Sequence, residues 1–388
     1  MNSELLYVFG TGNATVTNLY NTCFALRDGD EYFMVDAGGG NGILKILDNM
    51  QVPLEHIHHI FVTHAHTDHV LGIVWMVRMI ATKMKKDQYV GDTYIYCHSE
   101  LIETIRTLCR LTIQDKFYNM IGDRIHLEEV KDGETRHILS YDVTFFDIHS
   151  TKLKQFGFTL TLNNGRKLTC AGDEPYNPVC EKYVRGSDWL LHEAFCLYAE
   201  RDIWKPYEKH HSTVKDACEL AESLGIPNLV LWHTEDSNVA GRERLYKSEG
   251  KRYYSGNIYV PEPVIVKTVK EGKDLVVFGN FWSSTYYRNG NTLMSDSGGE
   301  VPARLRFTPD GNGGYAMKEK IVASDGADYE KSIRAFCKGY PVDPRKLMDS
   351  HDAWTKVRKE QLSNYVRQNQ LDIEYYKDYG WDPVKLEE

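Results

Sequence analysis

The stretch Thr63-His64-Ala65-His66-Thr67-Asp68-His69 combines three histidines with an aspartate. It directly follows a short β-branched and aromatic run that predicts a buried strand. In a loop that leaves a strand, alternate side chains can point the same way, so His64 and His66 can converge on one metal ion. Asp68 and His69 can reach a second ion beside it. Imidazole and carboxylate ligands together suit Zn²⁺ or another borderline transition metal.

Three further candidate ligands stand at the ends of predicted strands: His149, Asp173 and His233. A single polar residue at a strand end is more often structural than a ligand, and a histidine-rich surface loop is the plain alternative for the motif itself. Together, however, these residues complete two coordination shells. Asp173 is the economical bridging ligand, because one carboxylate can offer an oxygen to each of two ions.

The chain around these residues alternates strand-like and helix-like patterns, which indicates a layered α/β architecture. Asp28-Gly29-Asp30 and Asn163-Asn164-Gly165 each provide turn chemistry for a hairpin. The clearest helix covers Thr213 to Leu224, with Ser212 or Thr213 as its N-cap. The predicted strands are Leu5–Phe9, Thr22–Leu26, Tyr32–Val35, Ile60–Thr63, Val90–Cys97, Val143–His149, Phe158–Leu162, Lys167–Ala171 and Leu229–Trp232.

The composition changes near residue 270, where a charged turn without apolar periodicity begins. We therefore expect one large α/β domain at 1–269 and a smaller α+β domain at 270–388. The second domain is predicted to hold antiparallel strands at Leu275–Phe281, Ala303–Phe307 and Tyr315–Val322, followed by helices at Tyr329–Cys337 and Pro344 to about Gln368. Its aromatic residues favour a hydrophobic core, with a stacking surface or a homodimer interface as the alternatives; they include Phe281, Trp282, Tyr286 and Tyr287.

Composition excludes several classes of protein. Lys plus Arg total 46 and Asp plus Glu total 55, so the net charge is −9, which argues against stable nucleic-acid binding as the main task. No apolar run approaches the roughly 20 residues of a membrane span. The 8 cysteines are scattered, which favours reduced thiols in a cytoplasmic protein over a disulfide framework or a cysteine metal site.

The ligand pattern resembles that of the metallo-β-lactamase superfamily, over roughly residues 5–268. The resemblance implies an αββα sandwich, to which the smaller C-terminal α+β domain would be an addition outside the family pattern. It implies two divalent transition-metal ions, most simply Zn²⁺, with Mn²⁺ or Fe as alternatives. Asp36 would orient a ligand imidazole. The implied ligands are His64, His66 and His149 for one ion, Asp68, His69 and His233 for the other, and Asp173 as the bridge.

Within that superfamily the chain is most similar to ribonuclease Z and its phosphodiesterase relatives. Gly10-Thr11-Gly12-Asn13-Ala14, His192-Glu193-Ala194-Phe195 and His211-Ser212-Thr213 carry this similarity. It implies that Glu193 and His211 act as a pair near the leaving group, whereas an ordinary strand-end carboxylate and a solvated loop are the plain alternatives. The tRNA-processing members carry a long arm, commonly between the counterparts of His149 and Asp173. The segment Ser150–Gly172 leaves no room for it.

These features predict a dinuclear metal-dependent hydrolase, most simply a phosphodiesterase that acts through a metal-bound hydroxide. Asp68 and Asp173 would orient the water, and His211 would protonate the departing oxygen with support from Glu193. The alternatives are hydrolysis of another ester, such as a lactone or thioester, and tRNA 3′-processing. A metal-binding sensor module is the alternative from a different class, and the complete ligand set counts against it.

Overall fold

The structure is a computed structural model of the 388-residue chain. It divides into two compact units, Met1–Val264 and Ile265–Glu388. The domain boundary predicted between 269 and 270 falls inside β14 (Lys267–Glu271), because the charged stretch there belongs to a strand pairing. The described residues are 4–50, 52–237, 239–261, 267–271, 274–309, 315–324, 326–340, 342, 344–348, 358–359, 362–363, 366, 371–378 and 382–386.

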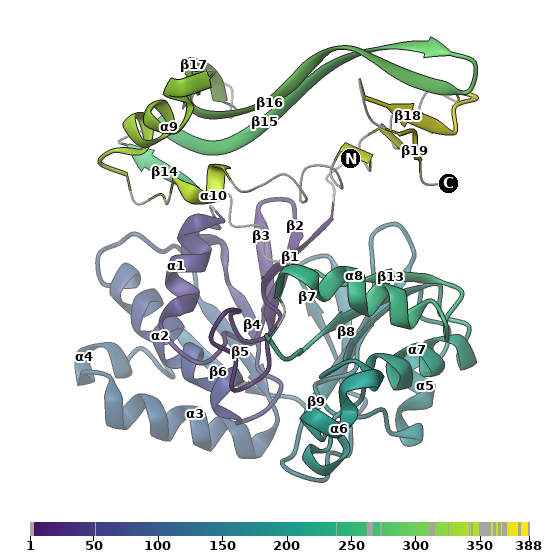
Figure 1. Ribbon diagram of the computed structural model, residues 1–388. Coiled ribbons are helices and arrows are strands. Elements are labelled where there is room, and N and C mark those ends of the chain that lie inside the picture. Colours follow the sequence, from purple (N-terminus) through teal and green to yellow (C-terminus); the bar gives the residue numbers. More distant parts are fainter. Residues whose placement is uncertain are drawn as a thin grey trace. The chain divides into compact units, whose positions relative to one another are not determined.

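Two mixed β-sheets form the centre of the first unit (Figure 1). The first runs in the order β1 (Leu5–Gly10), β2 (Cys23–Asp28), β3 (Glu31–Val35), β4 (His59–Phe61), β5 (Thr93–Cys97) and β6 (Ile125–Glu129). The second runs in the order β13 (Asn257–Tyr259), β12 (Asn228–Trp232), β11 (Trp189–Glu193), β10 (Lys167–Cys170), β9 (Phe156–Thr161), β8 (Tyr141–Asp147) and β7 (Thr135–Ile138).

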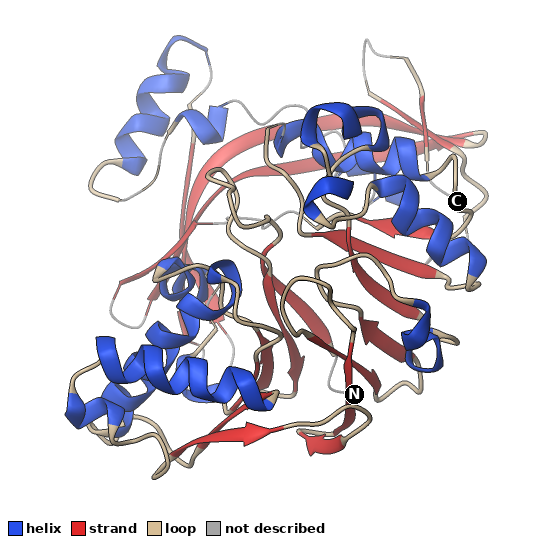
Figure 2. Ribbon diagram, turned by 90° about the horizontal axis from the view of Figure 1, so that it is seen from below, coloured by secondary structure: helices blue, strands red, loops and turns tan. Residues whose placement is uncertain are grey.

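Helices cover the outer face of each sheet (Figure 2). Beside the first sheet lie α1 (Gly42–Asn49), α2 (Thr67–Met84), α3 (Ser99–Thr112) and α4 (Asp115–Tyr118). Beside the second lie α5 (Glu181–Val184), α6 (Arg201–Trp204), α7 (Val214–Ser223) and α8 (Val239–Gly250). The predicted αββα sandwich is therefore confirmed. None of the helices that the structure describes has the length and apolar character needed to cross a membrane.

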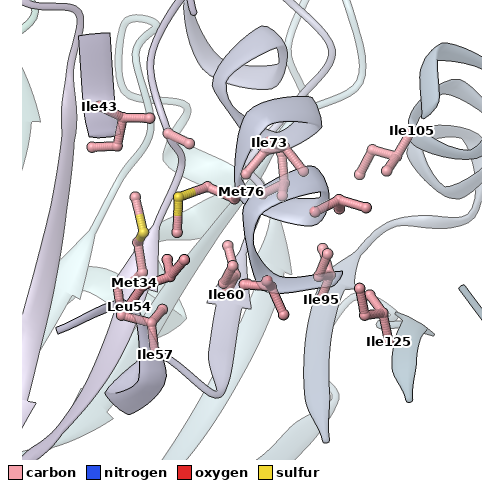
Figure 3. Packing of buried hydrophobic residues seen from close by; sticks show 14 of the residues in the cluster. Met34, Ile43, Leu54, Ile57, Ile60, Ile73, Met76, Ile95, Ile105 and Ile125 are labelled. Atoms are coloured by element: carbon pink, nitrogen blue, oxygen red, sulfur yellow. The ribbon is translucent and has the colours of Figure 1, made fainter. Parts of the chain in front are cut away.

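Alternation along the strands explains the four layers. In β3, Met34 faces the first helical layer, whereas Phe33 and Val35 face the space between the sheets. In β11, Leu190 faces the second helical layer and Leu191 faces inward. Because successive strand side chains point to opposite faces, a sheet that is apolar on both faces must be covered on both. Figure 3 shows the first of the three resulting cores, where isoleucines and methionines from β3 to β6 meet those of α1 to α3.

The predicted hairpins and the helix predicted over Thr213 to Leu224 are confirmed. β2 pairs with β3 across Gly29, and β9 pairs with β10 across Gly165; both glycines have positive φ, +61° and +82°. Helix α7 begins after Thr213, which caps it in a reciprocal capping box with Asp216. All 8 cysteines are buried free thiols.

The second unit holds a six-stranded sheet. The two short strands predicted at 275–281 and 303–307 are the ends of one long hairpin, which turns at Gly290. Most of the helix predicted from Pro344 to about Gln368 lies outside the described residues. The other elements are β14, β15 (Asp274–Asn289), β16 (Thr292–Pro309), β17 (Tyr315–Val322), α9 (Tyr329–Cys337), α10 (Arg345–Met348), β18 (Tyr375–Lys377) and β19 (Val384–Lys385).

Candidate metal centre

The His-rich motif connects a strand to the start of a helix. It follows β4, and its last two members, Asp68 and His69, lie in the first turn of α2. Close packing fixes this helix start. A Cβ atom at Gly72 would lie 1.9 Å from the carbonyl oxygen of Ala37, so only glycine lets α2 approach the backbone after β3. The motif is thus held against the end of β3.

Three neighbouring strands of the second sheet deliver the remaining polar side chains. β10, β11 and β12 are parallel, so their carboxyl ends lie at the same edge. Asp173 follows β10, Glu193 ends β11 and His233 follows β12. His233 adopts a positive φ of +55°, a conformation that is uncommon outside glycine. The sequence therefore brings acidic and imidazole groups from separate loops to one place.

The structure gathers six of the predicted ligands into two groups. His64, His66 and Asp173 form one, and Asp68, His69 and His233 form the other; within each group the potential ligand atoms lie within 4.8 Å of one another. Asp173 Oδ2 lies 3.5 Å from His64 Nε2, 3.4 Å from His69 Nε2 and 3.5 Å from His233 Nε2. Asp173 therefore stands between the two groups, where a bridging carboxylate would be needed.

The protonation states of these buried groups suit a metal ion. Burial lowers the pKa of His64 well below its usual value and that of His233 to about 4, so both imidazoles keep a lone pair. Burial alone would raise the pKa of Asp173, but His64 and His233 hold it well below its usual value. Metal ligands must be deprotonated, so the histidines and carboxylate are ready to bind.

Two buried ligand atoms, Asp68 Oδ2 and His69 Nε2, lie 3.3 Å apart as an ion pair but make no well-aligned hydrogen bond within the described part of the chain. Burial alone would lower the pKa of His69, but the carboxylates of Asp68 and Asp36 raise it well above its usual value. Buried polar atoms without hydrogen bonds are costly unless a ligand satisfies them. The cluster thus fits a divalent cation, which would supply the positive charge that these carboxylates favour.

A second layer of polar contacts orients the cluster. Asp36 Oδ2 lies 2.7 Å from His69 Nδ1 and accepts a hydrogen bond from the Thr63 hydroxyl, so Asp36 makes the imidazole contact predicted for it. Gln155 was not predicted. Its amide nitrogen donates to Asp173 Oδ1 and lies 3.2 Å from His64 Nδ1. Gln155 lies next to no motif residue in the sequence, so only the fold reveals its contact.

His149 is the predicted ligand that neither group includes. It lies just beyond β8, which ends at Asp147, and its side chain is exposed. Its backbone has a positive φ of +57°, and its N–H donates to Asp147 Oδ1 over 2.7 Å. Its membership of the ligand set therefore stays a prediction.

The predicted Glu193–His211 pair lies beside the second group. Glu193 is completely buried, and its Oε2 lies 3.6 Å from His211 Nδ1. The His211 ring stacks on Phe195 with centroids 5.0 Å apart, and its centroid lies 5.3 Å from that of His233. The backbone N–H of Ser212 donates to Glu193 Oε1, which fixes the carboxylate. The pair is thus adjacent to a candidate metal ligand.

Comparisons with known proteins agree with this geometry. The sequence model of the family described as "Anti-Pycsar protein Apyc1" matches residues 5–242. Ribonuclease Z of Thermococcus sibiricus is 26% identical over 281 residues, covering 59% of this chain and 85% of that protein. Ribonuclease Z of Parabacteroides distasonis is 19% identical over 268 residues, covering 58% of this chain and 87% of that protein.

Solved structures with the same fold include YhfI of Bacillus subtilis, a metallo-β-lactamase fold protein. It has a TM-score of 0.55 at 17% identity, and the alignment covers 66% of this chain and 96% of YhfI. The short form of human tRNase Z has a TM-score of 0.51 at 21% identity, covering 66% of this chain and 96% of its own. Both alignments span about two thirds of this chain, whereas the family model covers more than half of it. The chain has the metallo-β-lactamase fold, is related to ribonuclease Z, and belongs to the anti-Pycsar protein Apyc1 family.

Proposed function

We propose that this protein is a metal-dependent phosphodiesterase that holds two divalent ions, most simply Zn²⁺. The single observation that carries the proposal is the central place of Asp173, whose Oδ2 lies 3.4 to 3.5 Å from imidazole nitrogens of both groups. The names of the ribonuclease Z relatives support the same class of bond. The proposed ligands are His64, His66, His149, Asp68, His69, His233 and Asp173.

Bound ions of this kind polarise phosphoryl oxygens and make a water nucleophilic near neutral pH. The chain itself supplies orientation and proton transfer. Asp68 and Asp173 orient the attacking water by accepting its hydrogen bonds. His211 donates a proton to the departing oxygen, and Glu193, buried 3.6 Å away, stabilises the charged imidazole. Gln155 keeps the Asp173 carboxylate in a fixed orientation through its amide N–H.

The ammonium group of one lysine favours an anionic substrate over a neutral ester. Lys209 Nζ lies 5.0 Å from the centroid of Phe195, the ring that stacks on His211. Lys152 Nζ donates to the carbonyl oxygen of Lys209 over 3.0 Å, but it also lies 3.8 Å from Glu174 Oε1, which offsets its charge. Positive charge at the mouth of a site raises the local concentration of an anion. A lactone or thioester is neutral at the reacting group, so positive charge would not raise its local concentration.

The proposal is tested with the full chain loaded with Zn²⁺ or Mn²⁺. We expect turnover of bis-p-nitrophenyl phosphate that exceeds turnover of p-nitrophenyl acetate and of a simple lactone. Chelation should abolish it and added metal should restore it. Preferential hydrolysis of the acetate or lactone would support the other ester class. Tight metal binding without turnover of any substrate would favour the sensor module.

Cleavage of precursor tRNA is expected to be weak or absent. The segment between His149 and Asp173 is largely taken up by the hairpin of β9 and β10 with its turn, and the chain carries a net charge of −9. Tight tRNA binding depends on neutralising phosphates, which an acidic chain does poorly. Efficient 3′-end cleavage of a precursor tRNA at nanomolar protein would contradict this expectation and favour the processing endonuclease.

A further inference from the structure

The loop Gly10-Thr11-Gly12-Asn13-Ala14, which the proposed chemistry does not use, pairs with the loop that carries His233. Thr234 is the residue next to His233. Its N–H donates to the carbonyl oxygen of Thr11 over 2.9 Å, and its carbonyl oxygen accepts from the N–H of Asn13 over 3.0 Å. The side-chain amide of Asn13 donates to the same carbonyl oxygen over 3.1 Å. The backbone beside His233 is therefore held through both its donor and its acceptor.

Arg242 of α8 ties the same two loops together through their side chains. Its guanidinium is buried, with 2% of the residue exposed, and its Nη1 donates to the hydroxyl of Thr11 over 2.9 Å and to that of Thr234 over 2.7 Å. The planar guanidinium presents its donors in a fixed geometry. One buried side chain therefore sets the distance between the N-terminal loop and the residue after His233.

These contacts account for the uncommon backbone conformation of His233. Its φ of +55° is unfavourable outside glycine, so the surrounding contacts must hold it. Gly10 lets the N-terminal loop lie close to the start of β2, because a Cβ atom there would be 2.1 Å from the carbonyl oxygen of Asn21. In the conformation that results, His233 Nε2 lies 3.5 Å from Asp173 Oδ2. The loop thus helps to direct this imidazole toward the metal groups.

On the other side of the imidazole lies the hydroxyl of Thr22. Thr22 Oγ1 is 3.4 Å from His233 Nδ1 and 3.1 Å from the carbonyl oxygen of Gly12. A hydroxyl has one hydrogen to donate, and a carbonyl oxygen can only accept. When the Thr22 hydrogen points to Gly12, the hydroxyl oxygen can accept a hydrogen bond from Nδ1. The N-terminal loop therefore gives Thr22 the means to act as an acceptor.

Metal binding requires this direction of the hydrogen bond. A neutral imidazole carries one proton, and a nitrogen that binds a metal must be unprotonated. Nε2 is the nitrogen of His233 that faces Asp173, so the proton must lie on Nδ1. A ligand histidine usually donates that proton to a neighbouring acceptor, which orients the ring and raises its basicity. Asp36 is in place to accept it from His69, and Thr22 is the corresponding group at His233.

We propose that Thr22 and the loop Gly10–Ala14 form one positioning unit for the metal ligand His233. Thr22 accepts the Nδ1 proton, the carbonyl oxygen of Gly12 accepts the Thr22 hydrogen, and the rest of the loop holds the backbone at Thr234. Thr22 is a positioning residue, because it acts through His233 rather than on the substrate. This inference rests on the proposed metal centre and deepens it by giving a role to the N-terminal glycine-containing motif.

The first test measures the affinity of the full chain for Zn²⁺ by competition with a chelating dye. Thr22→Val replaces the hydroxyl by a methyl group, and we expect it to weaken metal binding by about 10–100-fold, the usual cost of losing such a partner. Thr22→Ser keeps the hydroxyl and should restore most of the affinity. Thr93→Val is the matched control: Thr93 is fully buried, but its hydroxyl meets that of Tyr89 rather than a histidine, so the affinity should not change.

The second test observes the imidazole proton by NMR in the Zn²⁺-loaded full chain labelled with ¹⁵N-histidine. The proton of His233 should appear on Nδ1 and exchange slowly with water, because it is buried and hydrogen-bonded. In Thr22→Val this signal should exchange faster, whereas the signal of His69, whose acceptor is Asp36, should remain. Thr22→Ser should restore the slow exchange. A role of Thr22 in packing alone would not move the signal.

Unchanged Zn²⁺ affinity in Thr22→Val, or an equal loss in Thr22→Ser, would overturn the inference and leave the phosphodiesterase proposal intact. Should Thr22→Val not fold, the unaltered chain decides the matter, because a proton on Nε2 of His233 in the Zn²⁺-loaded state would overturn the inference as well. Failure of the unaltered chain to bind Zn²⁺ would instead defeat the proposed function, and this inference with it.

Discussion

The two units of the chain differ in how their charged groups are arranged. In the second unit, Asp274 lies 3.5 Å from Arg306 and 3.4 Å from Lys318, and Arg304 lies 3.1 Å from Glu319. These charges meet partners of opposite sign from neighbouring strands. Unsatisfied buried atoms occur in both units among the described residues: Asp274 Oδ1 and Arg304 Nε in the second, Asp68 Oδ2 and His69 Nε2 in the first. The units differ in that the carboxylates and imidazoles of the first unit converge into two groups of potential metal ligands.

The difference separates charges that stabilise a fold from charges that await a ligand. A paired surface charge contributes little to the free energy of unfolding and needs no ligand. A buried cluster with unused ligand atoms costs stability, and such a cost is retained where it serves binding or catalysis. We therefore propose that the first unit carries out the hydrolysis and that the second has an accessory role.

The largest effect is expected for Asp173→Ala, because Asp173 stands between both ligand groups. Loss of a supporting partner typically costs 10–100-fold in metal affinity, and loss of a shared ligand should cost more than about 100-fold. Metal content measured after gel filtration should fall for both ions, together with activity. Asp142→Ala, at an exposed aspartate of β8, is the control and should keep both. Loss of only one ion would mean that Asp173 does not bridge.

The sequence predicted the fold where local signals agree with the tertiary structure. Gly29 and Gly165 sit at hairpins whose strands alternate, and Thr213 caps a helix with a clear apolar face. The long hairpin of the second unit was missed because its middle section, around Ser283 and Gly298, lacks an apolar alternation that would mark a strand. Pairing with its partner strand, rather than local preference, holds that section extended.

The metal site likewise combines residues that local sequence signals could predict with residues that only the tertiary structure brings together. The sequence could place His64, His66, Asp68 and His69 together because their spacing is local. It could bring Asp173 and His233 to them through strand ends, which share one edge in a layered α/β fold. It could not find Gln155, whose contact with Asp173 depends on how β9 lies against β10. Contacts between distant loops carry no periodic signal.

The next effect in size is expected for His211→Ala, which should lower turnover by about 10²–10⁴-fold, the usual share of a positioned proton donor. Metal content should not change. A p-nitrophenolate departs with little help, so the mutant should lose less turnover with a p-nitrophenyl substrate than with one that has an alkoxide leaving group. His210→Ala, the neighbouring exposed histidine, is the control. Equal losses for both leaving groups would indicate that His211 positions the substrate instead.

A smaller effect, about tenfold, is expected for Glu193→Gln. The amide keeps an acceptor for the Ser212 N–H but removes the charge that stabilises the imidazolium of His211. The two changes should not be additive, because each acts through the same proton transfer. Glu193→Gln should therefore cost little further activity in a His211→Ala background. Full additivity of the two losses in kcat would show that Glu193 acts independently of His211.

The smallest effect on activity is expected for Ile333→Ala, which tests the division of labour between the units. Ile333 is fully buried in α9 and packs in a core with Val276, Phe278 and Phe336. Its truncation should destabilise the second unit by about 2–5 kcal/mol, the usual cost of such a cavity. Metal content and turnover should stay within about twofold of the unaltered chain at temperatures where both units remain folded. Ile105→Ala, the same truncation in the core of the first unit, is the control and should lower the melting temperature of the metal-binding unit. A large loss of turnover in Ile333→Ala without loss of folding would place part of the chemistry in the second unit.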